Sequence, residues 1–93
     1  MTASLDDVRR QIDALDAQVV DLLAQRERLV RSAATFKKDE QGVRAPARVE
    51  QVIDRVRALA TERDASPDVV ERVYRAMIGA FIELELGEHR QTR

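Results

Sequence analysis

The N-terminal part of the chain carries a mostly apolar pattern whose heptad spacing continues without a break for more than four heptads. Its positions, spaced by steps of three and four, are Leu5, Val8, Ile12, Leu15, Val19, Leu22, Arg26, Leu29, Ala33 and Phe36. This spacing is typical of a helix that packs in coiled-coil fashion. No Gly or Pro interrupts residues 5–40, and Ser4 with Asp7 forms a candidate N-terminal cap. The pattern predicts one long helix that ends near residues 38–42, with Gly42 as a left-handed cap.

The length of this helix determines what can cover it. A helix of about 34 residues is about 50 Å long. A compact domain of 93 residues, in contrast, has a radius of gyration of about 12 Å. One copy of the chain therefore cannot cover the whole apolar face of its own helix. We expect two copies to pair, with their long helices antiparallel, in an intertwined homodimer.

Two shorter helices follow, each marked by a proline at its start. Pro46 and Pro67 can each occupy the first turn of a helix, where the missing N–H costs nothing, and a serine precedes the second of them as a cap. The second helix is predicted to continue to about residue 62, and the third to near Gly87. The predicted fold is all-α, with one long and two shorter helices in a single domain that spans residues 1–93.

The composition excludes several classes of function. Hydrophobic residues make up 44% of the chain but aromatic residues only 3%, which favours helix packing over a β-sandwich. No Cys and one His argue against disulfides, thiolate chemistry and a structural zinc site. Sixteen basic and seventeen acidic residues lack the basic excess of a nucleic-acid-binding protein. No apolar run approaches the roughly 20 residues of a membrane span, so we expect a cytoplasmic protein.

Four basic residues interrupt or border the apolar faces. Arg26 occupies a core position of the heptad pattern, where a guanidinium needs an anionic partner or access to water. Arg9 and Lys37 lie on a flanking row of the same helix, and Arg48 borders the apolar face of the second helix. Arg9 and Arg26 are about 25 Å apart along the helix, too far to share one small ligand. In an antiparallel dimer, Arg9 of one copy can approach Arg26 and Lys37 of the other.

These cations allow two interpretations. A polar residue at one core position often fixes the register of a coiled coil, and flanking charges often form interhelical ion pairs. The chain would then be a helical dimerisation module without chemistry. Alternatively, four converging cations form a site for a small dianion such as a dicarboxylate. Glu85, on the inward side of the third helix, is then either the ion-pair partner of one arginine or a hydrogen-bond donor beside the bound anion.

The joint spacing of these residues resembles the all-helical chorismate mutase family. The resemblance covers residues 5 to about 89 and includes the stretch LDDVRRQIDALDAQVVDLLAQRERLV, the following FK and the segment APARVEQVI. It implies an intertwined dimer of three-helix chains with two equivalent sites. It also implies a Claisen rearrangement of chorismate to prephenate, which needs no nucleophile, metal, cofactor or general base.

The same resemblance implies a role for each candidate residue. Arg26, Lys37 and Arg48 would bind the substrate in one chain, while Arg9 would reach in from the other. Arg9 and Arg26 would hold the two carboxylates, and Lys37 would donate to the ether oxygen as its C–O bond breaks. Glu85 matches a position where the family has Gln or Glu facing that oxygen. Catalysis would rest on holding the reactive conformer and on prearranged charge at the ether oxygen.

Some positions depart from the pattern of the mutases. Those enzymes have a Glu directly after the position of Arg48 and an Asp three residues before it, whereas this chain has Val49 and Ala45. The APARV segment, the FK and the terminal RQTR are closer to the isochorismate-pyruvate lyase branch, which produces salicylate and pyruvate. That branch, however, has Gln in place of Glu85. The resemblance implies chorismate mutase first, the lyase as the alternative, and amino-deoxychorismate mutase as a third possibility.

Overall fold

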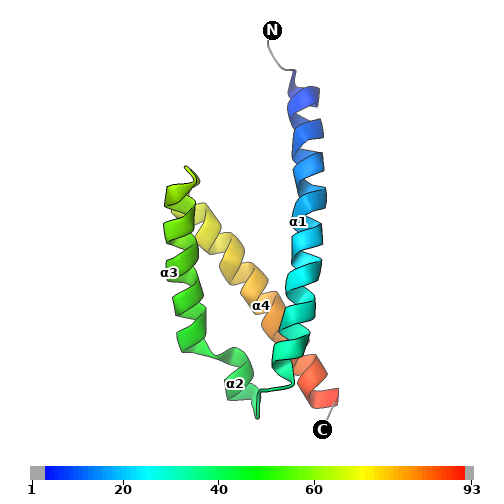
Figure 1. The fold of residues 1–93 in the computed structure, drawn as a ribbon, viewed down its shortest axis with the longest axis vertical. Coiled ribbons are helices and arrows are strands. Elements are labelled where there is room, and N and C mark those ends of the chain that lie inside the picture. The colour runs from blue at the N-terminus through cyan, green and yellow to red at the C-terminus, as the bar shows by residue number, and fades with distance from the viewer. Residues whose placement is uncertain (1–3, 92–93) are drawn as a thin grey trace.

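The computed structural model describes residues 4–91, apart from the side chains of residues 89 and 91, and consists of helices joined by short turns (Figure 1). The helices are α1 (Leu5–Ala34), α2 (Glu40–Arg44), α3 (Pro46–Glu62) and α4 (Pro67–Gln91). No strand occurs in this part of the chain. The predicted all-α fold of one long and two shorter helices is confirmed, and the short helix α2 is added to it. The last two residues of the terminal RQTR lie outside the described residues.

α1 begins where the sequence predicts but ends earlier. Ser4 Oγ accepts a hydrogen bond from the Asp7 N–H at 3.1 Å, and the Asp7 carboxylate accepts one from the Ser4 N–H at 3.3 Å. The predicted cap is therefore a reciprocal capping box. The predicted end at residues 38–42 is wrong, because the helix stops at Ala34. Directly after it, the Thr35 hydroxyl and backbone N–H both donate to the Ser32 carbonyl, which closes the last turn.

The expected left-handed cap at Gly42 is also wrong. Gly42 lies inside α2, and its backbone N–H donates to the Asp39 carboxylate at 2.8 Å, so Asp39 starts a new helix here. The left-handed residue is Ala45, with φ 37° and ψ 62°, which joins the end of α2 to Pro46. Pro46 occupies the first turn of α3, as predicted. A residue with a β-carbon is strained in this conformation, and the strain lies at the junction of α2 and α3.

α4 continues past Gly87, so the predicted end of the third helix is wrong. A glycine inside a helix costs about 1 kcal/mol relative to alanine. The turns that follow are tied to the rest of the chain. Arg90 donates to the Glu40 carboxylate of α2 through two nitrogens, at 2.9 and 3.0 Å, and Glu88 pairs with Arg31 of α1. These contacts help to offset the cost of the glycine.

The core lies between α3 and α4. Val52, Ile53 and Val56 of α3 are buried against Ile78 of α4. On the surface beside them, Arg75 of α4 donates to both oxygens of Glu50 of α3, at 2.9 and 3.0 Å. This pairing lowers the pKa of the Glu50 carboxyl below its usual value. α3 and α4 therefore form one unit, and α1 packs against this unit through contacts with α4.

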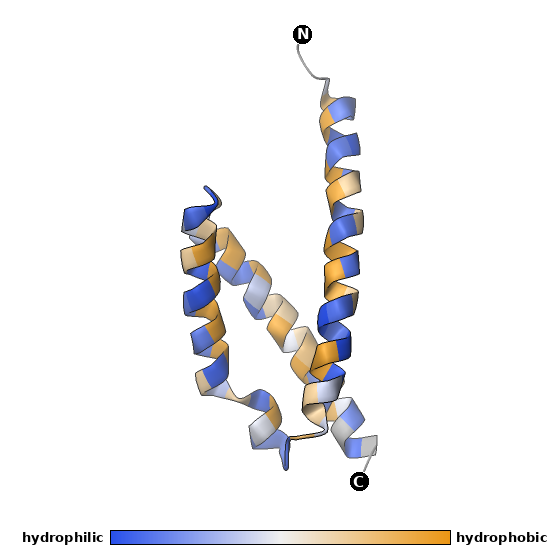
Figure 2. Ribbon diagram, in the orientation of Figure 1, coloured by the Kyte–Doolittle hydropathy of each residue, from blue (hydrophilic) through white to orange (hydrophobic). Residues whose placement is uncertain are grey.

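The N-terminal half of α1 projects beyond the other helices (Figure 1). The described chain measures 59 × 25 × 15 Å and its radius of gyration is 16.5 Å, well above the about 12 Å of a compact domain of this length. Apolar side chains remain exposed along α1, namely Leu5, Val8, Ile12, Leu15, Val19, Leu22 and Leu29, and Figure 2 shows apolar and polar positions alternating along this helix. None of the described helices combines the length and apolar character needed to cross a bilayer.

Candidate functional site

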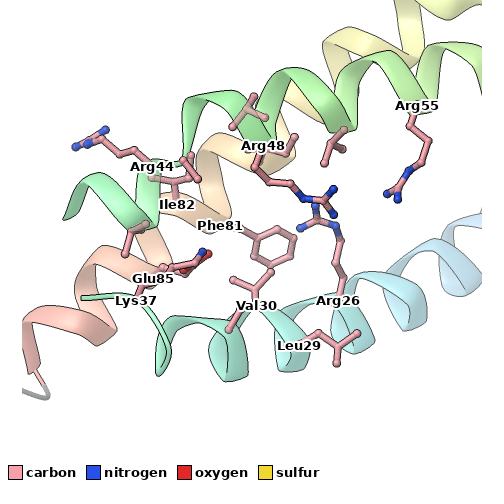
Figure 3. A pocket seen from close by; sticks show the side chains of 16 residues that line it. Arg26, Leu29, Val30, Lys37, Arg44, Arg48, Arg55, Phe81, Ile82 and Glu85 are labelled. Carbon is pink, nitrogen blue, oxygen red and sulfur yellow. The ribbon is translucent and has the colours of Figure 1, made fainter. Parts of the chain in front are cut away.

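A cavity of about 330 Å³ opens between α1, α3, α4 and the connection that contains α2 (Figure 3). Its apolar lining includes Val30, Val49, Val52, Ile78, Phe81 and Ile82. Its basic lining consists of Arg26, Lys37, Arg44, Arg48 and Arg55. Glu85 is the one carboxylate among the described residues that line it. A small cavity with an apolar wall and an excess of cations is suited to a compact organic anion.

Arg26 and Arg48 define the cationic end of the cavity. They come from α1 and from the first turns of α3, and Figure 3 shows their guanidinium groups pointing toward one another. The Arg26 guanidinium lies 5.2 Å from the centre of the Phe81 ring, a cation–π distance. Arg48 donates to the side-chain oxygen of Gln51 at 2.8 Å. Within residues 4–91 neither guanidinium has a carboxylate partner, so both charges remain available to a bound anion.

Lys37 and Glu85 define the opposite end, beyond Phe81 (Figure 3). Lys37 Nζ donates to Glu85 Oε2 at 2.8 Å. The Glu85 side chain is buried, with 6% of the residue exposed, and Lys37 is half-buried. A buried carboxylate requires such a partner. One of the two interpretations of Glu85 from the sequence was an ion pair with an arginine, and the partner in the structure is a lysine instead.

The connection that carries Lys37 packs closely against the end of α4. A β-carbon added at Gly42 would lie 3.6 Å from Lys37 Cβ, so α2 packs directly on the lysine. α2 is in turn held to α4 by the ion pair of Glu40 and Arg90. The last turns of α4 thus hold both Glu85 and the segment that presents Lys37.

Arg9 lies away from this cavity in a single chain. It is exposed on the projecting part of α1, about 25 Å from Arg26 along the helix. One chain therefore brings together four of the five predicted residues, namely Arg26, Lys37, Arg48 and Glu85.

Arg44 and Arg55 also line the cavity, although neither was predicted. Arg55 follows Arg48 by seven residues, which is two helical turns, so the periodicity of the second helix places both on one face. That spacing could have identified Arg55. Arg44 ends the unexpected helix α2, and no periodic pattern in the sequence marks it.

A second, larger cavity continues from the first between α1 and α4. Its volume is about 660 Å³, and it shares Arg26 and Phe81 with the first cavity. The rest of its lining is mostly apolar and includes Val19, Leu23, Val73, Tyr74 and Met77. This second cavity is an apolar groove that lies beside the exposed apolar side chains of α1. The cationic site therefore opens onto a surface that the chain itself leaves uncovered.

The chain is similar to known proteins along most of its length. A family model described as chorismate mutase type II matches residues 8–86. An isochorismate pyruvate lyase from Pseudomonas aeruginosa is 32% identical, over 96% of this chain and 88% of that protein. A chorismate mutase from Methanocaldococcus jannaschii is 26% identical, over 84% of this chain and 80% of that protein. The resemblance noted in the sequence is thereby confirmed, and this chain belongs to the chorismate mutase type II family.

Proposed function

We propose that this protein is a chorismate mutase, which converts chorismate to prephenate. The observation that carries the proposal is the pair of Arg26 and Arg48, whose guanidinium groups face one cavity without a carboxylate partner in the described chain. Guanidinium groups bind carboxylates through paired, charge-assisted hydrogen bonds. Family membership and the similarity to a chorismate mutase support the same assignment.

The geometry suits an intramolecular rearrangement. One C–O bond breaks and one C–C bond forms within a single molecule, so the protein supplies no atom or electron. Arg26 and Arg48 would hold a carboxylate at one end, and the Phe81 side of the cavity would confine the molecule to its compact reactive conformer. At the other end, Lys37 would stabilise the negative charge that develops on the ether oxygen.

The proposal includes a second copy of the chain, which would complete the site. Three features support this: the exposed apolar face of α1, the apolar groove beside it, and the distance of Arg9 from the cavity. Antiparallel α1 helices would cover both apolar surfaces. They would also bring Arg9 of one protomer to the cationic end of its partner's cavity, where it would bind the second carboxylate.

An isochorismate-pyruvate lyase is the second candidate. The similarity to the lyase from Pseudomonas aeruginosa favours it. The cavity wall at Ala45 and Val49 also favours the lyase. The resemblance leads one to expect acidic residues at these two positions in a mutase. Ala45 and Val49 carry no group that can accept a hydrogen bond from a ring hydroxyl. The cationic groups would bind either substrate, since chorismate and isochorismate carry the same two carboxylates.

Turnover with each substrate separately decides between these functions. Purified protein is incubated with chorismate or isochorismate while prephenate, salicylate and pyruvate are followed. Prephenate from chorismate without pyruvate is the expected result. A large preference for isochorismate, with salicylate and pyruvate as products, would establish the lyase instead. If the protein converts neither chorismate nor isochorismate, and amino-deoxychorismate is also unchanged, a helical dimerisation module without chemistry becomes the better description.

Replacement of Glu85 provides a further test of the mutase proposal. In the free protein its carboxylate accepts a hydrogen bond from Lys37. An amide at this position can still accept from Lys37 and can also donate to an ether oxygen, whereas alanine can do neither. We therefore expect Glu85→Ala to lower kcat by about a hundredfold and Glu85→Gln to retain more of the activity, with the exposed Glu83→Gln as control. Equal kcat values for wild type and Glu85→Ala would contradict a role of Glu85 at the ether oxygen.

A further inference from the structure

Arg55 lines the cavity but has no part in the chemistry proposed above. It lies two helical turns after Arg48 on α3, which is about 10 Å along the axis. Figure 3 shows its side chain on the side of α3 that faces α1, beyond Arg48 and away from Lys37. Arg55 therefore extends the cationic wall from the pair of Arg26 and Arg48 toward the exterior.

Like Arg26 and Arg48, but unlike Arg57 and Arg75, Arg55 has no carboxylate partner among the described residues. Two positions further along α3, Arg57 pairs with Asp68 at 3.0 Å and Glu71 at 2.8 Å. Arg75 of α4 likewise pairs with Glu50 and Glu71. Carboxylates are thus plentiful around α3, and they pair with the arginines between α3 and α4. The exposed Arg55 faces the cavity and keeps its charge available to an anion in solution.

The balance of charges in the cavity leaves Arg55 in excess of what one dianion requires. Lys37 and Glu85 neutralise each other. Arg26 and Arg48 remain for the substrate, together with Arg9 of a partner protomer in the proposed dimer. Arg44 is exposed, and Figure 3 shows its guanidinium directed away from the cavity. Arg55 is therefore a further cation directed at the mouth of an already cationic site. An exposed charge there costs little desolvation and raises the local concentration of anions.

We propose that Arg55 is a steering and recognition residue that attracts the dianionic substrate to the mouth of the cavity before a carboxylate reaches Arg26 and Arg48. This inference rests on the proposed function in that the substrate is a small dicarboxylate. The attraction acts through solvent, where the screening length is about 10 Å at 0.1 M salt and about 3 Å at 1 M. It therefore weakens as salt is added. Because Arg55 lies at the mouth and away from Lys37, it changes KM and kcat/KM and leaves kcat unchanged.

The test compares three variants at low and high salt. Arg55→Gln removes the charge, Arg55→Lys retains it, and Arg72→Gln removes the same charge from an exposed position of α4 that does not line the cavity. At low salt we expect Arg55→Gln to raise KM by about three- to tenfold, with kcat within about twofold of the wild type. Near 0.5 M salt the difference should fall below about twofold. Arg55→Lys and Arg72→Gln should behave like the wild type.

Three results would overturn the inference. The first is a KM for Arg55→Gln equal to that of the wild type at low salt. The second is a rise in the KM of Arg55→Gln that added salt does not reduce. The third is loss of dimers in Arg55→Gln, measured by sedimentation, which would show that Arg55 supports assembly. If Arg55→Lys then remains dimeric, the contact is an ion pair with a carboxylate of a second copy.

A binding measurement separates this inference from the proposed function. If the wild type turns over none of the three substrates, the proposed function fails. Calorimetric titration with isophthalate, a rigid aromatic dicarboxylate, then decides the role of Arg55. A weaker affinity of Arg55→Gln at low salt that approaches the wild-type value at high salt supports the inference. Equal affinities, or no binding of isophthalate to the wild type, overturn it.

Discussion

Arg26→Ala is expected to lower kcat/KM for chorismate by about a hundred- to a thousandfold, because it removes a preorganised cation from the substrate carboxylate. The half-buried Arg26 lies against Phe81 and faces Arg48 at the cationic end of the cavity. Without Arg26, Arg48 provides the one guanidinium from the same chain at this end of the cavity. The helices and the assembly state should remain intact, since Arg26 has no ion-pair partner among the described residues whose charge the mutation would strand.

The matched control for this variant is Arg28→Ala. Arg28 is exposed on the same helix and does not line either cavity, so its replacement should leave turnover within about twofold of the wild type. Steady-state kinetics is combined with thermal unfolding and size-exclusion chromatography for both variants. A register residue in a coiled coil gives the opposite pattern, with turnover retained and stability unchanged or increased in Arg26→Ala. That result would show that Arg26 does not bind the substrate.

A mixture of Arg9→Ala and Arg26→Ala proteins is expected to recover activity that neither variant has alone. In a mixed dimer, the intact Arg9 belongs to the Arg26→Ala chain and reaches the intact Arg26 of the other chain. One of the two sites is then complete. When equal amounts are unfolded together and refolded, half of the dimers are mixed, so about a quarter of the wild-type specific activity should return. This recovery tests directly whether Arg9 acts in the partner's site.

The control for the mixing experiment pairs Arg26→Ala with Arg48→Ala. Both residues line the cavity of one chain, so each site of a mixed dimer retains one defect and no activity should return. Recovery in this control would mean that the sites are not assembled as proposed. Absence of recovery in the mixture of Arg9→Ala and Arg26→Ala, with mixed dimers detected by mass, would show that Arg9 does not complete a partner's site.

The sequence predicted the parts of the fold that depend on periodic patterns and local caps. The start of α1 follows from Ser4 and Asp7, which lie three residues apart and need no tertiary contact. Its end could not be predicted in this way, because the apolar pattern continues to Phe36, while Thr35 and Asp39 redirect the backbone through their side chains. The continuation of α4 past Gly87 likewise involves contacts with α1 and α2, which are distant in the sequence.

In the candidate site, too, some residues could be predicted from periodic patterns and others depend on contacts between distant parts of the chain. Arg26 and Arg48 could be singled out because each breaks or borders a regular apolar face. The partner of Glu85 could not be predicted, since Lys37 is 48 residues away and lies after the true end of α1. Periodicity indicates which side of a helix a residue occupies, but it does not indicate which residue of another helix lies opposite.

The left-handed conformation of Ala45 has a consequence for how this site can change. Ala45 lines the cavity at the junction of α2 and α3, with φ 37°. Asn and Asp occupy this region of backbone space more readily than other residues with a β-carbon. The backbone at this position is thus already suited to a short polar side chain, and the buried core of Val52, Ile53 and Val56 lies further along α3. A single exchange of Ala45 for Asn or Asp can therefore place a polar group in the lining of the cavity without a change in the backbone or in the core.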